Sequence, residues 1–375
     1  MTTILENTAD VPGGKPVTPE KPEETRGLSQ GQIVRKRFFG HTGAVVSMVV
    51  LALVLLLSIT AIGLGPIPGW WKYDYTQTPP LMNGGHPTLQ LFPFSLGDHP
   101  FGQDRVGRDM FAMTMRGAQI SLFVMIVVGA IAALVGVLIG ASAGFFRGKT
   151  EAVLMRFTDM VIIIPALIAA AVVAQAAKGP ALLAIFLGLV SWTGMARLVR
   201  GDFLSLRERE FVDAARLAGA SNRRIIFKHI LPNAVGVITV NTTLLMSAAI
   251  LTETALSYVG LGIQNPDTSL GKLISDNQAA FSTRPWLFWW PGLFIVVICL
   301  TINFIGDGLR DAFDPRQKKL NVRRVKESPD RPQEQGMPAT RKPSEGGPSS
   351  ALSSGYLENL DQPADGGEGN EETQR

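Results

Sequence analysis

The chemically most distinctive part of the sequence is a charged stretch, 205–233, that lies between two apolar runs. A connection of this length within a compact bundle is unusual unless it is structured and functional. Its first half has the pattern of an amphipathic helix, with Phe211, Ala215 and the pair Leu217–Ala218 in one apolar stripe. Gly219 can adopt a positive φ and therefore predicts the end of that helix. The pattern indicates a docking surface, and the alternative is an amphipathic surface helix that only braces the bundle.

A second short helix is expected from Asn222 to Ile230, with Ile225 and Ile226 on one side and cations on the other. Pro232 is expected to stop this helix and to lie in the first turn of the next apolar segment. The two short helices would meet at an angle and leave one face free. Small alanine side chains in the first helix would let the backbone of another protein approach closely. The cations of the stretch would contact either acidic partner residues or anionic lipid headgroups, and both alternatives stay open.

Several motifs for catalysis and for nucleotide or metal binding are missing from the sequence, which restricts the functions to be considered. The sequence contains no GxxxxGK[ST] motif, so we expect no ATP site of the P-loop type. It has no nucleophile elbow, and its four histidines are scattered rather than spaced as metal ligands. The single cysteine, Cys299, lies in an apolar run and is expected to pack as a small apolar residue. Any energy source must therefore belong to another subunit.

The composition indicates the kind of structure that must hold residues 205–233 in place. Hydrophobic residues make up 46% of the 375 residues and charged residues only 18%, well below the roughly 25% of an average soluble domain. Lys and Arg number 35 against 31 Asp and Glu, a net charge of +4. The apolar residues are concentrated in long runs between polar ends. This pattern predicts an integral membrane protein, and it excludes a soluble enzyme and a nucleic-acid-binding role for the basic balance.

About six runs are long enough to cross a bilayer as helices, which needs roughly 20 mainly apolar residues each. The predicted spans are 43–64, 119–144, 155–177, 181–199, 234–257 and 287–306. Pro165 is expected to kink the third span. The glycines expected to allow close helix packing are Gly129, Gly136, Gly140 and Gly144.

Cations near the ends of the spans predict the orientation. Arg35, Lys36 and Arg37 precede the first span and place the N-terminus in the cytoplasm. With six spans, the loops 145–154 and 200–233 and the C-terminal tail then lie on the same side. Three arginines in the outer segment, Arg105, Arg108 and Arg116, count against this orientation.

Two groups of ionisable or polar residues within the spans have more than one interpretation. Arg156 and Asp159 lie three residues apart on one helical face, which favours a structural ion pair over a gating role. Glu253 is deep enough in the fifth span that leaving it unpaired would cost a few kcal/mol. Either it makes a structural hydrogen bond, or it lies with Tyr258 on a translocation path or gate.

The domain organisation follows from these spans. Residues 1–40 and 308–375 are rich in Pro, Glu, Gly and Ser. We expect 1–40 to be a disordered cytoplasmic tail and 308–375 to be a cytoplasmic tail that is mostly disordered. The first transmembrane helix is assigned to 41–64 and an extracytoplasmic segment to 65–116. The remaining membrane core is assigned to 117–307.

Four segments of the chain resemble one family. Asp213-Ala214-Ala215, then Gly219, then Pro232 thirteen residues further on, resembles the EAA loop of ABC importer permeases. Segments 99–122, 253–266 and 303–316 resemble signatures of the C-type permease subunit of dipeptide and oligopeptide importers. The resemblance covers about 95–316 plus the first span. The departures from the family pattern are Asp213 for Glu, His229 for Ile, Gln103 for Thr and Leu270 for an aromatic residue; the last two lie in outer segments that could bear on a receptor or substrate.

The resemblance implies an all-α bundle of about six transmembrane helices whose last five form a type I ABC importer permease core. It implies a transport subunit, not an enzyme, that imports di- or oligopeptides through the bacterial cytoplasmic membrane, with both termini cytoplasmic. Implied partners are a homologous B-type permease, two cytoplasmic ABC ATPases that bind ATP and Mg, an extracytoplasmic solute-binding protein and the bilayer, but no nucleic acid. No cofactor is expected in this chain. The residues implied to couple to the ATPase are Asp213, Ala214, Ala215, Arg216, Gly219, Arg223, Arg224, His229 and Pro232.

Three alternatives remain at this level. The same architecture imports nickel chelates or other small solutes in some relatives of this family. A secondary transporter or channel would need ionisable residues near the centres of several spans, and inverted repeats with broken helices. A membrane-anchored scaffold, whose tails carry its function, leaves the four matching segments without an explanation.

Overall fold

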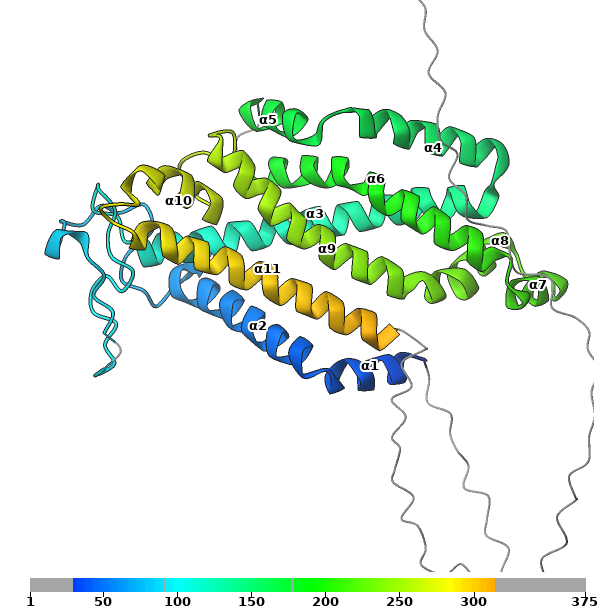
Figure 1. Cartoon of the computed structure of the whole chain (residues 1–375), viewed down its shortest axis with the longest axis horizontal. Coiled ribbons are helices and arrows are strands. Elements are labelled where there is room, and N and C mark those ends of the chain that lie inside the picture. The colour runs from blue at the N-terminus through cyan, green and yellow to red at the C-terminus, as the bar shows by residue number, and fades with distance from the viewer. Residues whose placement is uncertain (1–29, 91, 177–178, 314–375) are drawn as a thin grey trace, which may run out of the picture. The chain divides into compact units, whose positions relative to one another are not determined.

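The structure, a computed structural model, describes residues 30–90, 92–176 and 179–313, and these residues are mainly helical (Figure 1). Within them, five helices are long and apolar enough to cross a membrane, and a bent pair of helices makes a sixth crossing if the pair is one span. The five are α2 (Thr42–Ile62), α3 (Met110–Phe146), α6 (Pro180–Arg207), α9 (Leu231–Tyr258), which continues a helical segment from Asn222, and α11 (Trp286–Phe313). The predicted all-α membrane protein with about six spans is confirmed.

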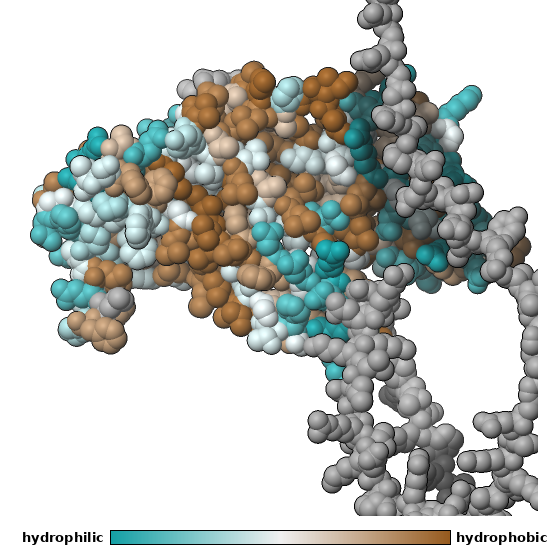
Figure 2. Space-filling view, in the orientation of Figure 1, coloured by the Kyte–Doolittle hydropathy of each residue, from teal (hydrophilic) through white to brown (hydrophobic). Residues whose placement is uncertain are grey.

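The surface of these helices is suited to lipid rather than water. Figure 2 shows hydrophobic residues over the middle of the helices and hydrophilic residues gathered toward their ends. Leu53, Leu134 and Val172 are 59%, 63% and 65% exposed. Apolar side chains of this size remain exposed at such density only where a hydrocarbon phase covers them.

The N-terminal end of the described chain differs from its prediction. Residues Gln30–Gly40 form a helix, α1, so the prediction of disorder for 1–40 is wrong for 30–40, whereas residues 1–29 lie outside the described part. At Gly308 of α11 an added Cβ would lie 2.2 Å from Ala44 Cβ and 3.5 Å from the Phe38 ring, so α1 and α2 pack closely there. This contact is between residues far apart in sequence, and the composition of 1–40 contains no sign of it.

The C-terminal tail begins with a helical segment, which its prediction as mostly disordered allows. Helix α11 continues to Phe313 instead of ending near residue 306, so residues 308–313 are helical. His41, which caps α2 by accepting a hydrogen bond from the Ala44 N–H at 3.1 Å, lies 3.5 Å from Asp311 through its other ring nitrogen. Residues 314–375, the rest of the predicted tail, lie outside the described part.

The segment between α2 and α3 is compact and polar at its centre. It begins with a hairpin of β1 (Gly63–Leu64) and β2 (Ile67–Pro68) and includes a 3₁₀ turn, η1 (Asn83–Gly85). Asp109 caps α3 by accepting from the Ala112 N–H at 2.8 Å, and it also accepts from Trp71 at 2.9 Å. These bonds fix the point at which the chain enters α3, seven residues before the predicted core.

Helices α3 and α6 pack against each other along a line of glycines. A Cβ added at Gly136 would lie 2.7 Å from the Met195 side chain, and one at Gly140 would lie 2.4 Å from the Ala196 carbonyl oxygen. Gly144 meets Phe203 and the Arg200 backbone at a similar distance. Only glycine permits this approach of two backbones. The predicted packing role of these glycines is confirmed.

The third predicted span is broken. Helix α4 (Gly148–Ile163) and helix α5 (Ala166–Ala176) meet at an angle of 69°. Pro165 lies in the break, where it has no N–H to donate and restricts Ile164 to an extended conformation. The prediction of a kink at Pro165 is confirmed.

The remaining elements are short. They are α7 (Glu210–Leu217), α8 (Asn222–Arg224), the π-helical turn η2 (Ile225–Ile230), α10 (Leu270–Asn277) and the 3₁₀ turn η3 (Gln278–Ala280).

Candidate functional site

The stretch 205–233 folds as α7, a tight turn and the beginning of a long helix. The turn is a Schellman motif: the Gly219 N–H donates to the Arg216 carbonyl at 2.9 Å, and the Ala220 N–H donates to the Ala215 carbonyl at 3.0 Å. Gly219 has a φ of 77°, as its sequence position predicts, and no atom lies within 4 Å of a Cβ added there. The turn therefore needs a residue that adopts positive φ readily, as glycine does, while the space beside it is open.

The inner face of α7 differs from the predicted apolar stripe. Val212 and Ala215 are buried, whereas Phe211 is 39% and Leu217 91% exposed. The buried pair belongs to an apolar cluster with residues of four other elements. Its other buried members are Ala141, Phe145, Met195, Val199, Phe203, Ile225, Ile230 and Ala234. The cluster fixes α7 to α3, α6, η2 and α9, and it leaves two large apolar side chains outside.

The second half of the stretch corrects a prediction. It is not a separate short helix that Pro232 stops, because the chain is helical without interruption from Asn222 to Tyr258. In η2 the hydrogen bonds span five residues, as from the Leu231 N–H to the Ile226 carbonyl. A π-helical turn accommodates a residue without an N–H, so Pro232 is tolerated inside the helix. Asn233 Nδ2 in turn donates to the His229 carbonyl at 2.6 Å.

The predicted coupling residues lie mostly on the free side of this segment. Asp213 and Arg216 form an exposed ion pair, with 3.0 Å between Oδ1 and Nη1. Arg223 and Arg224 are exposed, and no carboxylate of the described residues is within ion-pair distance of either. The other exposed members of the set are Ala214, Gly219 and Pro232, and His229 is half-buried.

The structure separates the two residues predicted for a path or gate. The Glu253 side chain is fully buried, where Oε1 accepts hydrogen bonds from Ser257 at 2.7 Å and Ser269 at 2.6 Å. Ser269 also caps α10 by accepting from the Lys272 N–H at 3.1 Å. Tyr258 is 53% exposed, on a different side of α9. Of the two alternatives for Glu253, the geometry supports the structural hydrogen bond, which ties α9 to α10.

The predicted ion pair between Arg156 and Asp159 is wrong. Asp159 Oδ1 instead accepts from Arg197 of α6 at 2.5 Å. One side of α4 faces α6, and Asp159 lies on that side with Glu151, whose Oε1 accepts from Arg200 Nε at 2.7 Å. The two pairs border a groove of about 450 Å³ between the helices. Sequence reasoning missed Arg197 and Arg200 because their partners on α4 lie 38 and 49 residues away in the sequence.

Two residues that depart from the family pattern have structural rather than surface roles. Gln103 is fully buried; its amide oxygen accepts from the Met82 N–H at 2.8 Å, and its amide nitrogen donates to the Gly107 carbonyl at 2.9 Å. Leu270 is fully buried between α3, α9 and α11. The expectation that either residue bears directly on a receptor or substrate is not supported by these positions.

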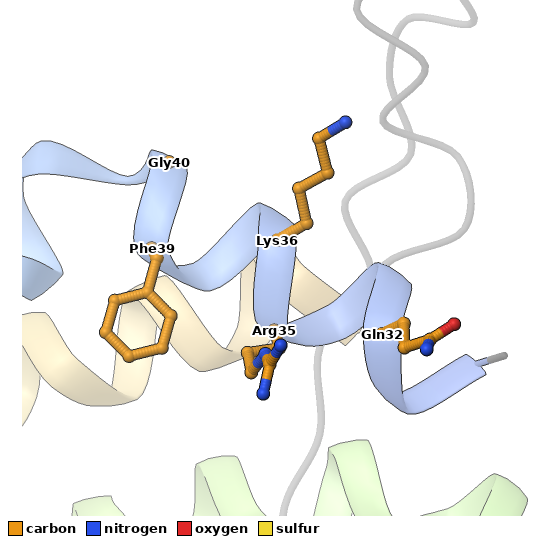
Figure 3. A pocket seen from close by; sticks show the side chains of 5 residues that line it. All are labelled: Gln32, Arg35, Lys36, Phe39 and Gly40. Atoms are coloured by element: carbon orange, nitrogen blue, oxygen red, sulfur yellow. The ribbon is translucent and has the colours of Figure 1, made fainter. Parts of the chain in front are cut away.

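Helix α1 presents cations on more than one side. Figure 3 shows Arg35 and Phe39 directed to one side of the helix and Lys36 to the opposite side. With Gln32 and Gly40, these residues border a shallow cleft of about 590 Å³. A short helix that carries cations and an exposed aromatic ring next to a membrane span is typical of a membrane–water boundary.

Comparisons with known proteins agree with this architecture. Residues 136–319 match the family described as "Binding-protein-dependent transport system inner membrane component", and residues 29–90 match "N-terminal TM domain of oligopeptide transport permease C". The oligopeptide transport system permease protein OppC of Haemophilus influenzae is 37% identical over 296 residues, which cover 79% of this chain and 91% of that protein. The proteins of the same name from Bacillus subtilis and Escherichia coli K12 are also 37% identical, over 78% and 79% of this chain and 92% and 94% of theirs. The first match includes the entire stretch 205–233, and the second includes α1.

Proposed function

Because the chain belongs to the family of binding-protein-dependent transport system inner membrane components, we propose that it forms half of the translocation pathway of an ATP-driven importer and couples to a separate ATPase through residues 205–233. The other half of the pathway would come from a homologous B-type permease. Two cytoplasmic ATPases would bind ATP and Mg, and an extracytoplasmic binding protein would deliver the solute. The chain itself would perform no hydrolysis.

The substrate we propose is a di- or oligopeptide. The proposal follows from the similarity over more than three quarters of the chain to several proteins named oligopeptide permeases. Import of nickel chelates by the same architecture is the alternative. Delivery by a separate binding protein would place much of the selectivity outside this chain.

The observation that carries the coupling role is the outward position of Leu217, which is 91% exposed at the end of α7. Exposure of a leucine side chain to water in a cytoplasmic loop is unfavourable unless a partner protein covers it. Full burial of such a side chain contributes roughly 1.5–3 kcal/mol. Phe211, on the same short helix, is 39% exposed. Together they supply apolar anchors for a groove on another protein.

A force applied to α7 would reach the membrane through the cluster beneath it. Val212 and Ile225 are both buried there, together with residues of α3 and α6. The helix from Asn222 to Tyr258 has no break, so a displacement of its start would also move its membrane portion. To shift an inward–outward equilibrium from 1:99 to 99:1, ATPase closure must change the relative free energy by about 5.5 kcal/mol.

The pathway would include one side of α9. Asn241 and Thr252 are partly exposed on this side, and their side chains donate to backbone carbonyls one turn earlier, at 2.9 Å in both cases. Polar side chains satisfied in this way can border a hydrated path without the cost of an unpaired group in lipid. The break at Pro165 is a feature that secondary transporters also have, but the helices beside it carry no ionisable residue between 160 and 174.

The orientation we propose places the N-terminus and residues 205–233 in the cytoplasm. Arg35, Lys36 and Arg37 of α1 precede the first span, and the stretch 205–233 carries the densest group of cations between spans. Labelling of single cysteines in a Cys299→Ser background tests this directly. A cysteine introduced at Leu217 should react only after the membrane is permeabilised to the reagent, whereas one at Val106 should react from outside.

Uptake tests the function. Cells that lack this chain would be complemented with the wild type or with Gly219→Trp, and supplied with labelled di-, tri- and pentapeptides and with nickel. We expect the wild type alone to restore peptide uptake, since the tryptophan would occupy the open space beside the turn where the ATPase docks. Normal uptake by a stably inserted Gly219→Trp protein would reject the coupling role. Uptake of nickel without any peptide would reject the peptide substrate and leave the permease function intact.

A further inference from the structure

A groove lies between the C-terminal half of α3 and the start of the long helix at Asn222. Its volume is about 420 Å³. The residues that border it are Val137, Leu138, Ala141, Ser142, Phe146, Asn222, Arg223, Ile226, Phe227 and Leu231. One wall thus belongs to a membrane helix and the other to the segment we propose for coupling.

The two walls run in opposite directions. Gly129 of α3 faces Met246 of α9, so residues later in α3 face residues earlier in the long helix. Phe146 therefore lies toward Arg223 at one end of the groove, and Val137 lies toward Leu231 and beyond at the other. Val137 and Phe146 are nine positions apart, which corresponds to a length of about 13 Å along a helix. The groove extends from the charged end of the helices into their apolar middle.

The interior of the groove is apolar, and its end is cationic. Seven of its ten bordering residues are hydrocarbon or aromatic. The Ser142 hydroxyl is satisfied within α3, where it donates to the Leu138 carbonyl at 2.7 Å. Arg223 is exposed at the charged end, and its guanidinium has no ion-pair partner in the part of the chain that the structure describes.

We propose that this groove binds one acyl chain of an anionic phospholipid and that Arg223 binds its phosphate. An acyl chain needs an apolar channel that opens to the bilayer, and Leu138, Phe146 and Phe227 are each more than half exposed there. A phosphate at the membrane boundary supplies the negative charge that Arg223 lacks. The cation at one end and the apolar lining of the rest both match this occupant.

A helix of another subunit matches less well. An apolar helix would bury Arg223 without a counter-charge, which is costly. The charged end of the groove therefore favours an occupant that carries its own negative charge.

Because the groove lies between α3 and the start of the long helix, bound lipid would affect transport. This part rests on the proposed function. The lipid would contact α3 on one side and Ile226 and Phe227 on the other. It would hold the start of the long helix against the membrane core. Anionic lipid would then change the efficiency with which movement of α7 reaches α9.

Native mass spectrometry of the full chain, purified in mild detergent with its co-purifying subunits, tests the site. Phosphatidylglycerol and zwitterionic phosphatidylethanolamine would be added at equal concentrations and the bound lipid counted. We expect phosphatidylglycerol to bind preferentially to the wild type. Arg223→Gln should weaken that binding about fivefold, which corresponds to roughly 1 kcal/mol for one cation at an anionic surface. It should weaken phosphatidylethanolamine binding less, because the ammonium group of that lipid already neutralises its phosphate.

Two controls make the result specific. Arg224→Gln removes the neighbouring cation, which does not border the groove, and should leave lipid binding unchanged. Leu138→Trp places a larger side chain in the apolar channel and should reduce binding of both lipids, while its unfolding temperature stays that of the wild type. Free glycerol 3-phosphate should not displace the lipid.

The proposal is overturned by equal binding of the two lipids to the wild type, by equal losses in Arg223→Gln and Arg224→Gln, or by displacement with glycerol 3-phosphate. The experiment counts bound lipid directly, so it tests the lipid site even in a complex that imports no peptide. Failure of the lipid site and failure of the proposed transport function are therefore distinguishable.

Discussion

The Ala220 N–H donates to the carbonyl of Ala215 at 3.0 Å, and this bond closes the chain around Gly219 between α7 and the helix that becomes α9. The bond joins a residue of the apolar cluster to the turn itself. Ala215 is buried against α3 and α6, so the direction in which α7 leaves the membrane core is set by packing and by a backbone conformation together.

The conformation of the turn should depend on the φ of residue 219, whereas the size of the side chain there should affect docking of the ATPase. Gly219→Asn keeps access to positive φ and should retain most uptake, whereas Gly219→Val should lower it severalfold, because a β-branched residue at φ 77° is strained by roughly 1–3 kcal/mol. The measurement is the initial rate of peptide uptake per amount of inserted protein. Equal rates for both variants would show that the turn conformation does not matter for coupling.

Leu217 should anchor the ATPase. Leu217→Glu should reduce co-purification of the ATPase subunit at least tenfold and leave the stability of this chain within about 0.5 kcal/mol, since the side chain is 91% exposed. Val106→Glu is the matched control, because Val106 is a 66% exposed apolar residue in the segment between α2 and α3. Loss of the ATPase from both variants, or from neither, would contradict the assignment of α7 as the docking element.

The pair of Asp159 and Arg197 should contribute little to stability. Both side chains are about half exposed, so their coupling free energy should be about 0–1 kcal/mol. A double-mutant cycle with Asp159→Asn and Arg197→Gln, followed by thermal unfolding in detergent, measures it. Arg156→Gln should show no coupling to Asp159→Asn. A coupling above about 1 kcal/mol between Arg156 and Asp159 would restore the pair that the structure excludes.

Glu253 should act through stability. Glu253→Ala leaves the hydroxyls of Ser257 and Ser269 without their acceptor and should cost about 2–5 kcal/mol of unfolding free energy, whereas Glu253→Gln keeps an acceptor oxygen and should cost less than about 2 kcal/mol. Thermal unfolding and uptake would be measured on both. If Glu253→Gln unfolds like the wild type yet abolishes uptake, the residue belongs to the path instead.

The close approach of α3 and α6 makes Gly140 a sensitive position. Gly140→Ala would place a Cβ 2.4 Å from the Ala196 carbonyl oxygen, so the helices must separate at a cost of about 1–3 kcal/mol. Gly194→Ala, on α6, meets no atom within 4 Å and should be neutral or slightly stabilising. The midpoints of thermal unfolding compare the two. An unchanged midpoint for Gly140→Ala would contradict the contact.

Much of the fold was predictable because its causes are local. A bilayer requires about 20 consecutive apolar residues for each crossing, and such runs are visible in the chain without knowledge of their neighbours. The break at Pro165 and the turn at Gly219 are local for a similar reason, since each follows from the backbone preference of one residue. The resemblance of the stretch around Gly219 to a known loop depended on the same short-range spacing.

By itself, then, the sequence determined the spans, the turn and the family. The partners of individual side chains were decided only by the tertiary structure. Asp159 pairs with Arg197 rather than with Arg156 because α6 lies beside α4. Phe38 of α1 packs against Gly308 of α11, and Glu253 of α9 accepts a hydrogen bond from Ser269 at the start of α10. These contacts join residues far apart in sequence, and their free energy depends on geometry that spacing and composition do not contain.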